Sequence, residues 1–432
     1  MKRFFLLTLA SAALLGASAA PVKTYEVKSP DGRLALVLTA GERLSFTVAR
    51  DGETLVAPSE MALTLSTGEV LGESPRVRSA RRRAVTETID APLYRQSRFD
   101  AAYNELDLRL RGDYGILARA YDDGVCYRFY TERDGELTIV DETAQLNFEG
   151  DPSAYIPYSK TEIPMRTSFE NTYEYAPLSK FRTQTVAFMP VLVDLGERGY
   201  VLYTESDVEA YPGVYLTYDK EAKGFAARFA ECPTETSLTK RFQDVVERSA
   251  DYIARVDGRR SYPWRIVAYA ATATELPVND MVWQTAEASR VADASWVRDG
   301  KIAWDWWNNW GVYGVDFKSG INTETYKYFI DFAAANGIEY VALDEGWGVR
   351  DGDVMHVVPE IDLPEIVSYA REKKVGIILW VVAKVLDDKL EEACRYYSEL
   401  GVAGWKVDFI DRQDQAAVER VYRIADAAVF IT

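Results

Sequence analysis

Short runs of alternating apolar and polar residues recur between residue 21 and about residue 270. Short runs in which every second residue is apolar lie at 33–38, 44–48, 106–110 and 127–130. This period of two is typical of strands with one buried face, and sequences such as Asp51-Gly52 between the runs favour tight turns. The pattern predicts an all-β domain of the sandwich type, which we place at residues 21–272.

From residue 301 the pattern changes to apolar strands that alternate with helices. Strands are predicted at 302–307, 340–343, 376–382 and 404–410, and helices at 323–336, 362–373, 386–400 and 413–427, with Asp362 as an N-cap. Residues 273–300 read as a linker with short helices. Strands that are apolar along their whole length are typical of a parallel sheet covered by helices. The four units at 301–432 fit an open α/β sheet or the first half of a (β/α)8 barrel, and no glycine-rich phosphate loop follows any strand.

The first twenty residues have the character of a signal peptide. Lys2 and Arg3 precede an apolar run at 4–15, and small residues at 17–19 offer a cleavage site. The apolar run is too short to span a bilayer, and no cysteine follows it as a lipid attachment point. We therefore expect a protein that is secreted across the inner membrane, periplasmic and without a stable membrane anchor. A buried N-terminal helix is the alternative.

Net charge and rare residue types limit the chemistry. The chain has 67 acidic and 50 basic residues, a formal net charge of −17, which argues against nucleic acid or an anionic membrane as partner. Its three cysteines form no metal-ligand pattern, so we expect buried free thiols, with one long-range disulfide as the alternative. The single histidine, His356, lies in an apolar stretch where a structural role is expected. Catalysis would therefore rest on carboxylates.

The ends of the first two predicted strands carry tryptophans and carboxylates. They are Trp304, Asp305, Trp306, Trp307, Asp344, Glu345 and Trp347. In a barrel, functional residues collect at the C-terminal ends of the strands. Flat aromatic faces pack against sugar rings, and carboxylates hold hydroxyls or act at the anomeric carbon. We therefore predict binding of an oligosaccharide or glycoside, although a tryptophan taken singly is often a core residue.

Asp408 ends the fourth predicted strand. Lys406 precedes it by two residues, so both side chains lie on one face of the strand, roughly 7 Å apart. A lysine at that position favours the ionised carboxylate, the state that a nucleophile requires. In the alternative interpretation, Asp408 caps the next helix or pairs with Arg412.

Several stretches together resemble glycoside hydrolase family 97. They are 103–106, 120–125, 169–173, 204–207, 211–213, 304–308, 343–347 and 406–409. The resemblance implies an N-terminal β-sandwich domain, a (β/α)8 barrel and a C-terminal β domain. Retaining members of the family, mainly α-galactosidases, carry an aspartate within a Lys-Val-Asp-Phe stretch, which residues 406–409 match. Inverting α-glucosidase members lack that aspartate, so the chain is similar to the retaining branch.

The resemblance also implies roles for individual residues. Asp408 would be the nucleophile that forms a covalent glycosyl-enzyme when a terminal α-galactosidic bond is cleaved with retention. Asp344 would hold substrate hydroxyls, and we add Lys406, Asp305, Trp304, Trp306, Trp307 and Trp347 as substrate-binding candidates. The family binds calcium through glutamates, one of them from the N-terminal domain. Glu170 is our candidate for that ligand, with Glu174 and Glu205 as alternatives.

The sequence departs from the family pattern at its C-terminal end. The acid/base glutamate of the family comes from a later barrel strand, so we expect it to lie outside this chain, which ends about where a fifth strand would begin. Half a barrel has open sheet edges, and a retaining mechanism without its second carboxyl group lacks a proton donor. We therefore expect this chain by itself to be inactive and poorly stable. The alternative functions are an α-glucosidase, a β-L-arabinopyranosidase, a non-catalytic sugar-binding protein and an α/β protein unrelated to sugars.

Overall fold

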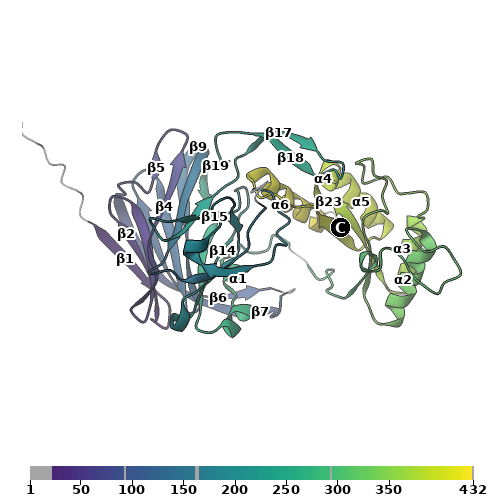
Figure 1. Cartoon of the computed structure of the whole chain (residues 1–432), viewed down its shortest axis with the longest axis horizontal. Helices are drawn as coiled ribbons and strands as arrows, with labels where there is room; N and C mark the ends of the chain where they lie inside the picture. Colours follow the sequence, from purple (N-terminus) through teal and green to yellow (C-terminus); the bar gives the residue numbers. More distant parts are fainter. Residues whose placement is uncertain (1–21, 92–93, 161–164, 292–293, 431–432) are drawn as a thin grey trace, which may run out of the picture.

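The chain folds into a large β domain and a smaller α/β part. The structure, a computed structural model, describes residues 22–91, 94–160, 165–291 and 294–430. The expected signal peptide at 1–20 therefore lies outside the described residues. Figure 1 shows the two parts side by side, with helix α6 (Gln415–Phe430) between them and the hairpin of β17 (Pro233–Leu238) and β18 (Asp244–Ser249) extending from the β domain toward the α/β part.

The N-terminal part is an antiparallel β-sandwich, as predicted. Its strands, besides β17 and β18, are β1 Lys23–Lys28, β2 Leu34–Ala40, β3 Leu44–Arg50, β4 Glu53–Leu65, β5 Val70–Leu71, β6 Val77–Asp90, β7 Arg98–Leu110, β8 Tyr114–Tyr121, β9 Gly124–Asn147, β10 Ser153–Ile156, β11 Glu174–Pro177, β12 Ala187–Phe188, β13 Val191–Asp194, β14 Tyr200–Ser206, β15 Tyr215–Asp219, β16 Gly224–Arg228, β19 Ala254–Ser261 and β20 Trp264–Ala270. Alternate residues of β2 are buried, which is the reason for the period of two in the sequence. The long strand β9 pairs with β4, β8, β16, β19 and β20 and so joins the sheets.

A buried ionic triad lies inside the sandwich. Arg265 on β20 is 1% exposed and bonds Glu142 of β9 through two nitrogens, at 2.7 and 2.8 Å. Its third nitrogen lies 2.5 Å from Glu205 of β14. Glu205 also accepts a hydrogen bond from the Val214 amide. Each carboxylate therefore depends on one guanidinium for its countercharge in the core.

The C-terminal part contains the four predicted parallel strands in sequence order. Its elements are β21 Ile302–Trp304, the 3-10 turn η4 Asp305–Asn308, α2 Thr323–Ala335, β22 Tyr340–Leu343, α3 Leu363–Glu372, β23 Gly376–Val382, α4 Ala383–Asp388, α5 Leu390–Leu400, β24 Gly404–Asp408 and α6. Neighbouring strands are paired in parallel, for example with Trp304 opposite Ala342 and Trp380 opposite Lys406. The fold-class prediction of a β-sandwich followed by βα units is confirmed.

Several boundaries differ from the predicted ones, among them those of the last helix, which spans Gln415–Phe430 rather than 413–427. The first strand ends at Trp304 because the following residues turn into η4, and the helix predicted at 386–400 is divided into α4 and α5 around Lys389. The fourth strand ends at Asp408, because Phe409 has a left-handed backbone with φ of 60°. The predicted linker at 273–300 contains the short helices η3 (Ala273–Val278) and α1 (Met281–Thr285).

Within the described ranges, no helix is long and apolar enough to cross a membrane. The three cysteines, Cys126, Cys232 and Cys394, are buried and free, as expected.

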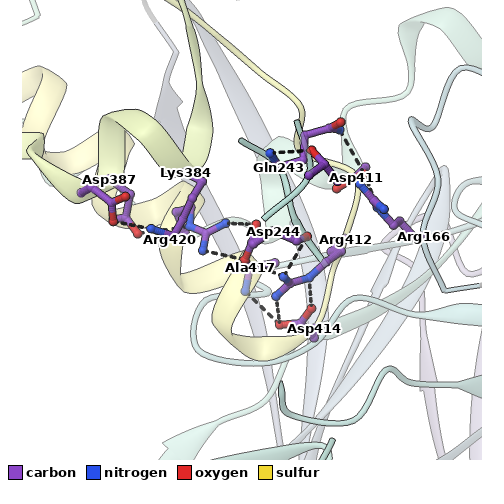
Figure 2. Close-up of polar contacts among 12 residues, drawn as sticks. Arg166, Gln243, Asp244, Lys384, Asp387, Asp411, Arg412, Asp414, Ala417 and Arg420 are labelled. Atoms are coloured by element: carbon purple, nitrogen blue, oxygen red, sulfur yellow. Dashed lines mark hydrogen bonds and ion pairs between the residues drawn. The ribbon is translucent and has the colours of Figure 1, made fainter. Parts of the chain in front are cut away.

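An ionic network joins the sandwich to the α/β part (Figure 2). Asp244, the first residue of β18, accepts bonds from Arg412 at 2.6 Å and from Arg420 at 3.0 Å. Arg412 also binds Asp414, and Arg420 also binds Asp387 of α4. Because Arg412 lies in the loop that follows β24, Asp244 fixes that loop to the β17–β18 hairpin.

Candidate active site

Asp408 stands at the C-terminal tip of β24 with its carboxylate held by three groups. The Trp380 indole donates to Oδ2 at 2.8 Å, and the Phe409 amide donates to Oδ1 at 2.7 Å. Lys406 Nζ lies 3.7 Å from Oδ2. The side chain is nevertheless 39% exposed, so one side of the carboxylate is open to a ligand.

Lys406 connects Asp408 to Asp344, which directly follows β22, two strands away in the sheet. Its ammonium lies 2.6 Å from Asp344 Oδ2, closer than to Asp408, and 4.2 Å above the centre of the Trp304 ring. The Trp304 indole donates to the same oxygen of Asp344. The structure therefore brings together Trp304, Asp344, Lys406 and Asp408, four of the residues chosen from the sequence.

Asp305 lies beneath this group. It is 0% exposed, its Oδ2 accepts a hydrogen bond from the Tyr326 hydroxyl at 2.7 Å, and its Oδ1 lies 3.2 Å from the Asp344 amide, which donates to it. A side chain without exposed surface cannot contact a substrate. The predicted substrate-binding role of Asp305 is therefore corrected to a supporting one, since the residue fixes the end of β22. Burial raises its pKa from an ordinary 3.8 to about 6.

The pH dependence of folding should report on Asp305. Because its pKa is higher in the folded than in the unfolded chain, its contribution to stability is complete below about pH 4 and is lost as the pH rises through about 6. Between pH 5 and 7.5 the loss is about 1.4 kcal/mol in the free energy of unfolding. Urea unfolding should show Asp305→Asn gaining that amount relative to the wild type over this interval. Parallel pH profiles for the two proteins would contradict the assignment.

The tryptophans divide into an exposed group and a buried one. Trp304 and Trp306 stack with ring centres 5.3 Å apart, and Trp307 packs edge-on against both. Trp306 and Trp307 are 45% and 72% exposed, so they offer free aromatic faces at the strand ends. Trp347, in contrast, is 3% exposed and donates to the Trp380 carbonyl from within the core. It also lines a pocket together with Glu345 and Trp380, so its contact with substrate stays a prediction.

Two residues of the site were not predicted from the sequence. Trp380 lies in a strand that is apolar on both faces, so the sequence pattern does not show which of its side chains face the site. Trp380 could have been found only from its pairing opposite Lys406 in the sheet. Arg241 comes from the turn between β17 and β18. It binds Glu345 at 2.7 Å, and both residues border a pocket that Trp380 also lines.

The glutamates predicted as calcium ligands belong to no cluster of possible metal ligands among the described residues. Glu170 is exposed, and within the described ranges no three His, Cys, Asp or Glu side chains gather as metal ligands. Of the alternatives, Glu174 pairs with Arg182 and Glu205 with Arg265. Calcium takes six to eight oxygen ligands, so these residues alone do not fit the ion, and we derive no chemistry through it.

His356 is exposed in the loop between β22 and α3, where Nδ1 lies 2.7 Å from Asp351. That hydrogen bond raises the pKa of His356.

Comparisons with known proteins identify the family of the chain. The family model described as Glycosyl-hydrolase 97 N-terminal matches residues 27–287, and the model described as Glycoside hydrolase 97 matches 306–429. A retaining alpha-galactosidase of Bacteroides thetaiotaomicron is 42% identical over 413 residues, which cover 94% of this chain and 62% of the relative. A probable retaining alpha-galactosidase of Streptomyces bingchenggensis is 30% identical over 89% of this chain and 56% of the relative.

Solved structures agree on the fold. A glycoside hydrolase family 97 enzyme from Pseudoalteromonas sp. strain K8, in complex with acarbose, superposes with a TM-score of 0.79 at 18% identity, covering 94% of this chain and 64% of that one. A beta-arabinopyranosidase gives 0.74 at 21% identity, covering 94% and 65%. The chain thus spans about three fifths of the length of the curated relatives, 62% and 56%.

Proposed function

Because the chain belongs to glycoside hydrolase family 97, we propose that its strand-end site is the sugar-binding part of an α-galactosidase active site that works with retention of configuration. The observation that carries the proposal is the carboxylate of Asp408, which two hydrogen-bond donors and a nearby ammonium orient while 39% of the side chain stays exposed. A nucleophile requires this combination of fixed direction and open access.

The proposed reaction has two steps. A carboxylate oxygen of Asp408 attacks the anomeric carbon of the galactosyl unit, and the bond from that carbon to the leaving-group oxygen breaks. Water later replaces Asp408 at the same carbon, so configuration is retained. Lys406, which the buried Asp344 holds in place, binds sugar hydroxyls, and the exposed faces of Trp306 and Trp307 pack against the ring or its substituents.

An acid/base residue completes a retaining mechanism by protonating the leaving group and then activating water. We assign this role to none of the described residues. Asp344 is bound by Lys406 and Trp304, and Glu345 is bound by Arg241 and by Arg350 at 3.1 Å. Both carboxylates therefore already accept hydrogen bonds or ion pairs from neighbouring side chains, and neither is free to exchange a proton with a leaving group or water.

The proposal predicts a burst of product without turnover. Dinitrophenolate is a good leaving group that needs no protonation, so 2,4-dinitrophenyl α-galactoside should react with Asp408 without an acid. Hydrolysis of the galactosyl-enzyme requires water activation and should be slow. We expect about one equivalent of dinitrophenolate per chain, and one galactosyl unit on the peptide that contains Asp408 in mass spectrometry.

Each other outcome separates an alternative. Absence of both burst and label would contradict the nucleophile, and galactose binding without a burst would favour a sugar-binding protein. Sustained turnover would place an acid/base residue within this chain. A larger burst with the α-glucoside or the β-L-arabinopyranoside would change the substrate assignment.

The cellular location is a separate proposal. We propose export across the inner membrane to the periplasm, on the basis of the basic, apolar and small-residue segments of residues 1–20. Fractionation of cells that express the chain with and without these residues tests it, and an equal distribution of both proteins would contradict it.

A further inference from the structure

The turn of the β17–β18 hairpin lies beside the candidate site. Thr239 donates to the Gln243 carbonyl and Phe242 to the Thr239 carbonyl, so the turn is internally closed. Asp244, directly after it, is bound by Arg412 and Arg420 of the α/β part (Figure 2). The position of the turn is therefore fixed relative to the loop that follows Asp408.

Arg241 projects from this turn onto the residue next to Asp408. Its guanidinium lies 4.4 Å from the centre of the Phe409 ring, within the range of a cation–π contact. The same guanidinium donates to Glu345 at 2.7 Å, which holds it over the ring. Arg350 pairs with the other oxygen of Glu345.

Phe409 has a backbone conformation that a phenylalanine adopts only under constraint. Its φ of 60° lies in the left-handed region, which is unfavourable for a side chain with a Cβ atom. In this conformation its amide donates to Asp408 Oδ1. Its ring packs edge-on against Trp380, with centres 5.6 Å apart, and Trp380 donates to Asp408 Oδ2. Both hydrogen bonds to the carboxylate therefore depend on where Phe409 lies.

We propose that Arg241 is a positioning residue for the nucleophile. By covering the ring of Phe409, it stabilises the left-handed backbone that directs the Phe409 amide at Asp408 and keeps Trp380 in place. The N-terminal domain would thereby set the direction of a carboxylate that belongs to the α/β part. This inference rests on the proposed role of Asp408.

Two variants separate this role from a general effect on Glu345. Arg241→Gln removes the cation from both Phe409 and Glu345, whereas Arg350→Gln removes a cation from Glu345 alone. The first readout is hydrogen exchange of the Phe409 amide, which requires no chemistry. The second is the rate constant of the dinitrophenolate burst at saturating and at limiting substrate.

We expect Arg241→Gln to speed exchange of the Phe409 amide about 10-fold and to slow the saturated burst about 10- to 100-fold, since small misplacements of reacting groups have effects of this size. The substrate concentration for half-saturation should change less than about two-fold, because Arg241 acts on the carboxylate rather than on sugar binding. Arg350→Gln should leave both readouts within about two-fold of the wild type. Arg241→Lys, which keeps the cation, should recover part of the loss.

The outcomes are distinguishable from failure of the proposed function. If the wild type gives no burst, the proposed function fails and the exchange readout alone decides this inference. Equal protection of the Phe409 amide in Arg241→Gln and in Arg350→Gln overturns it, as does equal slowing of the burst by both variants. Matching midpoints of thermal unfolding for the three proteins show that the comparison is made between folded chains.

Discussion

Asp408→Asn is expected to reduce dinitrophenolate release from 2,4-dinitrophenyl α-galactoside by roughly a thousand-fold or more, because an amide oxygen is a poor nucleophile. The side chain keeps its size, and its carbonyl oxygen can still accept the Phe409 amide, which is bound at 2.7 Å in the wild type. The effect should therefore fall on bond formation to the anomeric carbon rather than on folding. Burst amplitude and the galactosyl label on the peptide that spans Asp408 are the measurements.

Asp388→Asn is the matched control. Asp388 is half exposed at the end of α4 and pairs with Lys384, and it makes no hydrogen bond or ion pair with Asp408, Lys406 or Asp344. Its burst should match that of the wild type. An undiminished burst or label in Asp408→Asn would show that another residue carries the sugar, and the proposed mechanism would have to be abandoned.

Arg265→Met is expected to lower the free energy of unfolding by about 3–5 kcal/mol, the usual consequence of removing one partner from a buried ion pair. Arg265 is the shared countercharge of Glu142 and Glu205, and both carboxylates stay in the core when it is lost. Burial already raises the pKa of Glu205 even with Arg265 present. Urea unfolding followed by circular dichroism measures the loss.

Arg33→Met provides the comparison. Arg33 binds Asp51 at 2.7 Å, but both side chains are about half exposed to water, so the loss of this pair should change stability only slightly. A similar small effect for Arg265→Met would mean that the two glutamates find other partners or take up protons at little cost.

Local pattern was sufficient for the elements of the fold. The period of two in β2 and the apolar strand β23 follow from which faces are buried, and Asp362 caps α3 as expected, with its side chain accepting from the Glu365 amide at 2.9 Å. The end of β24 could not be predicted in the same way. Residues 409 and 410 are apolar and extend the pattern, but the contacts of Phe409 with Arg241 and Trp380 favour a turn there.

The sequence was sufficient to predict several residues of the site but not the contacts between them. Same-face spacing placed Lys406 beside Asp408, but the ammonium lies nearer to Asp344, which lies 62 residues earlier, directly after β22. Asp305 looked like a ligand residue because of its position after a strand, but its side chain is fully buried. Arg241 is 168 residues from Phe409 along the chain, and no local pattern carries such a contact.

The hairpin also bears on how freely the two domains can be exchanged among relatives. The chain crosses from the sandwich to the α/β part near residues 273–300, yet Arg241 and Asp244, which support the loop after Asp408, are encoded before that crossing. A chimera joined at the crossing would combine the turn of one protein with the β24 loop of another. Recombination should therefore yield working enzymes only when residues 239–244 come from the same parent as residues 409–414. The residues that must be kept together for this site thus include a segment of the N-terminal domain.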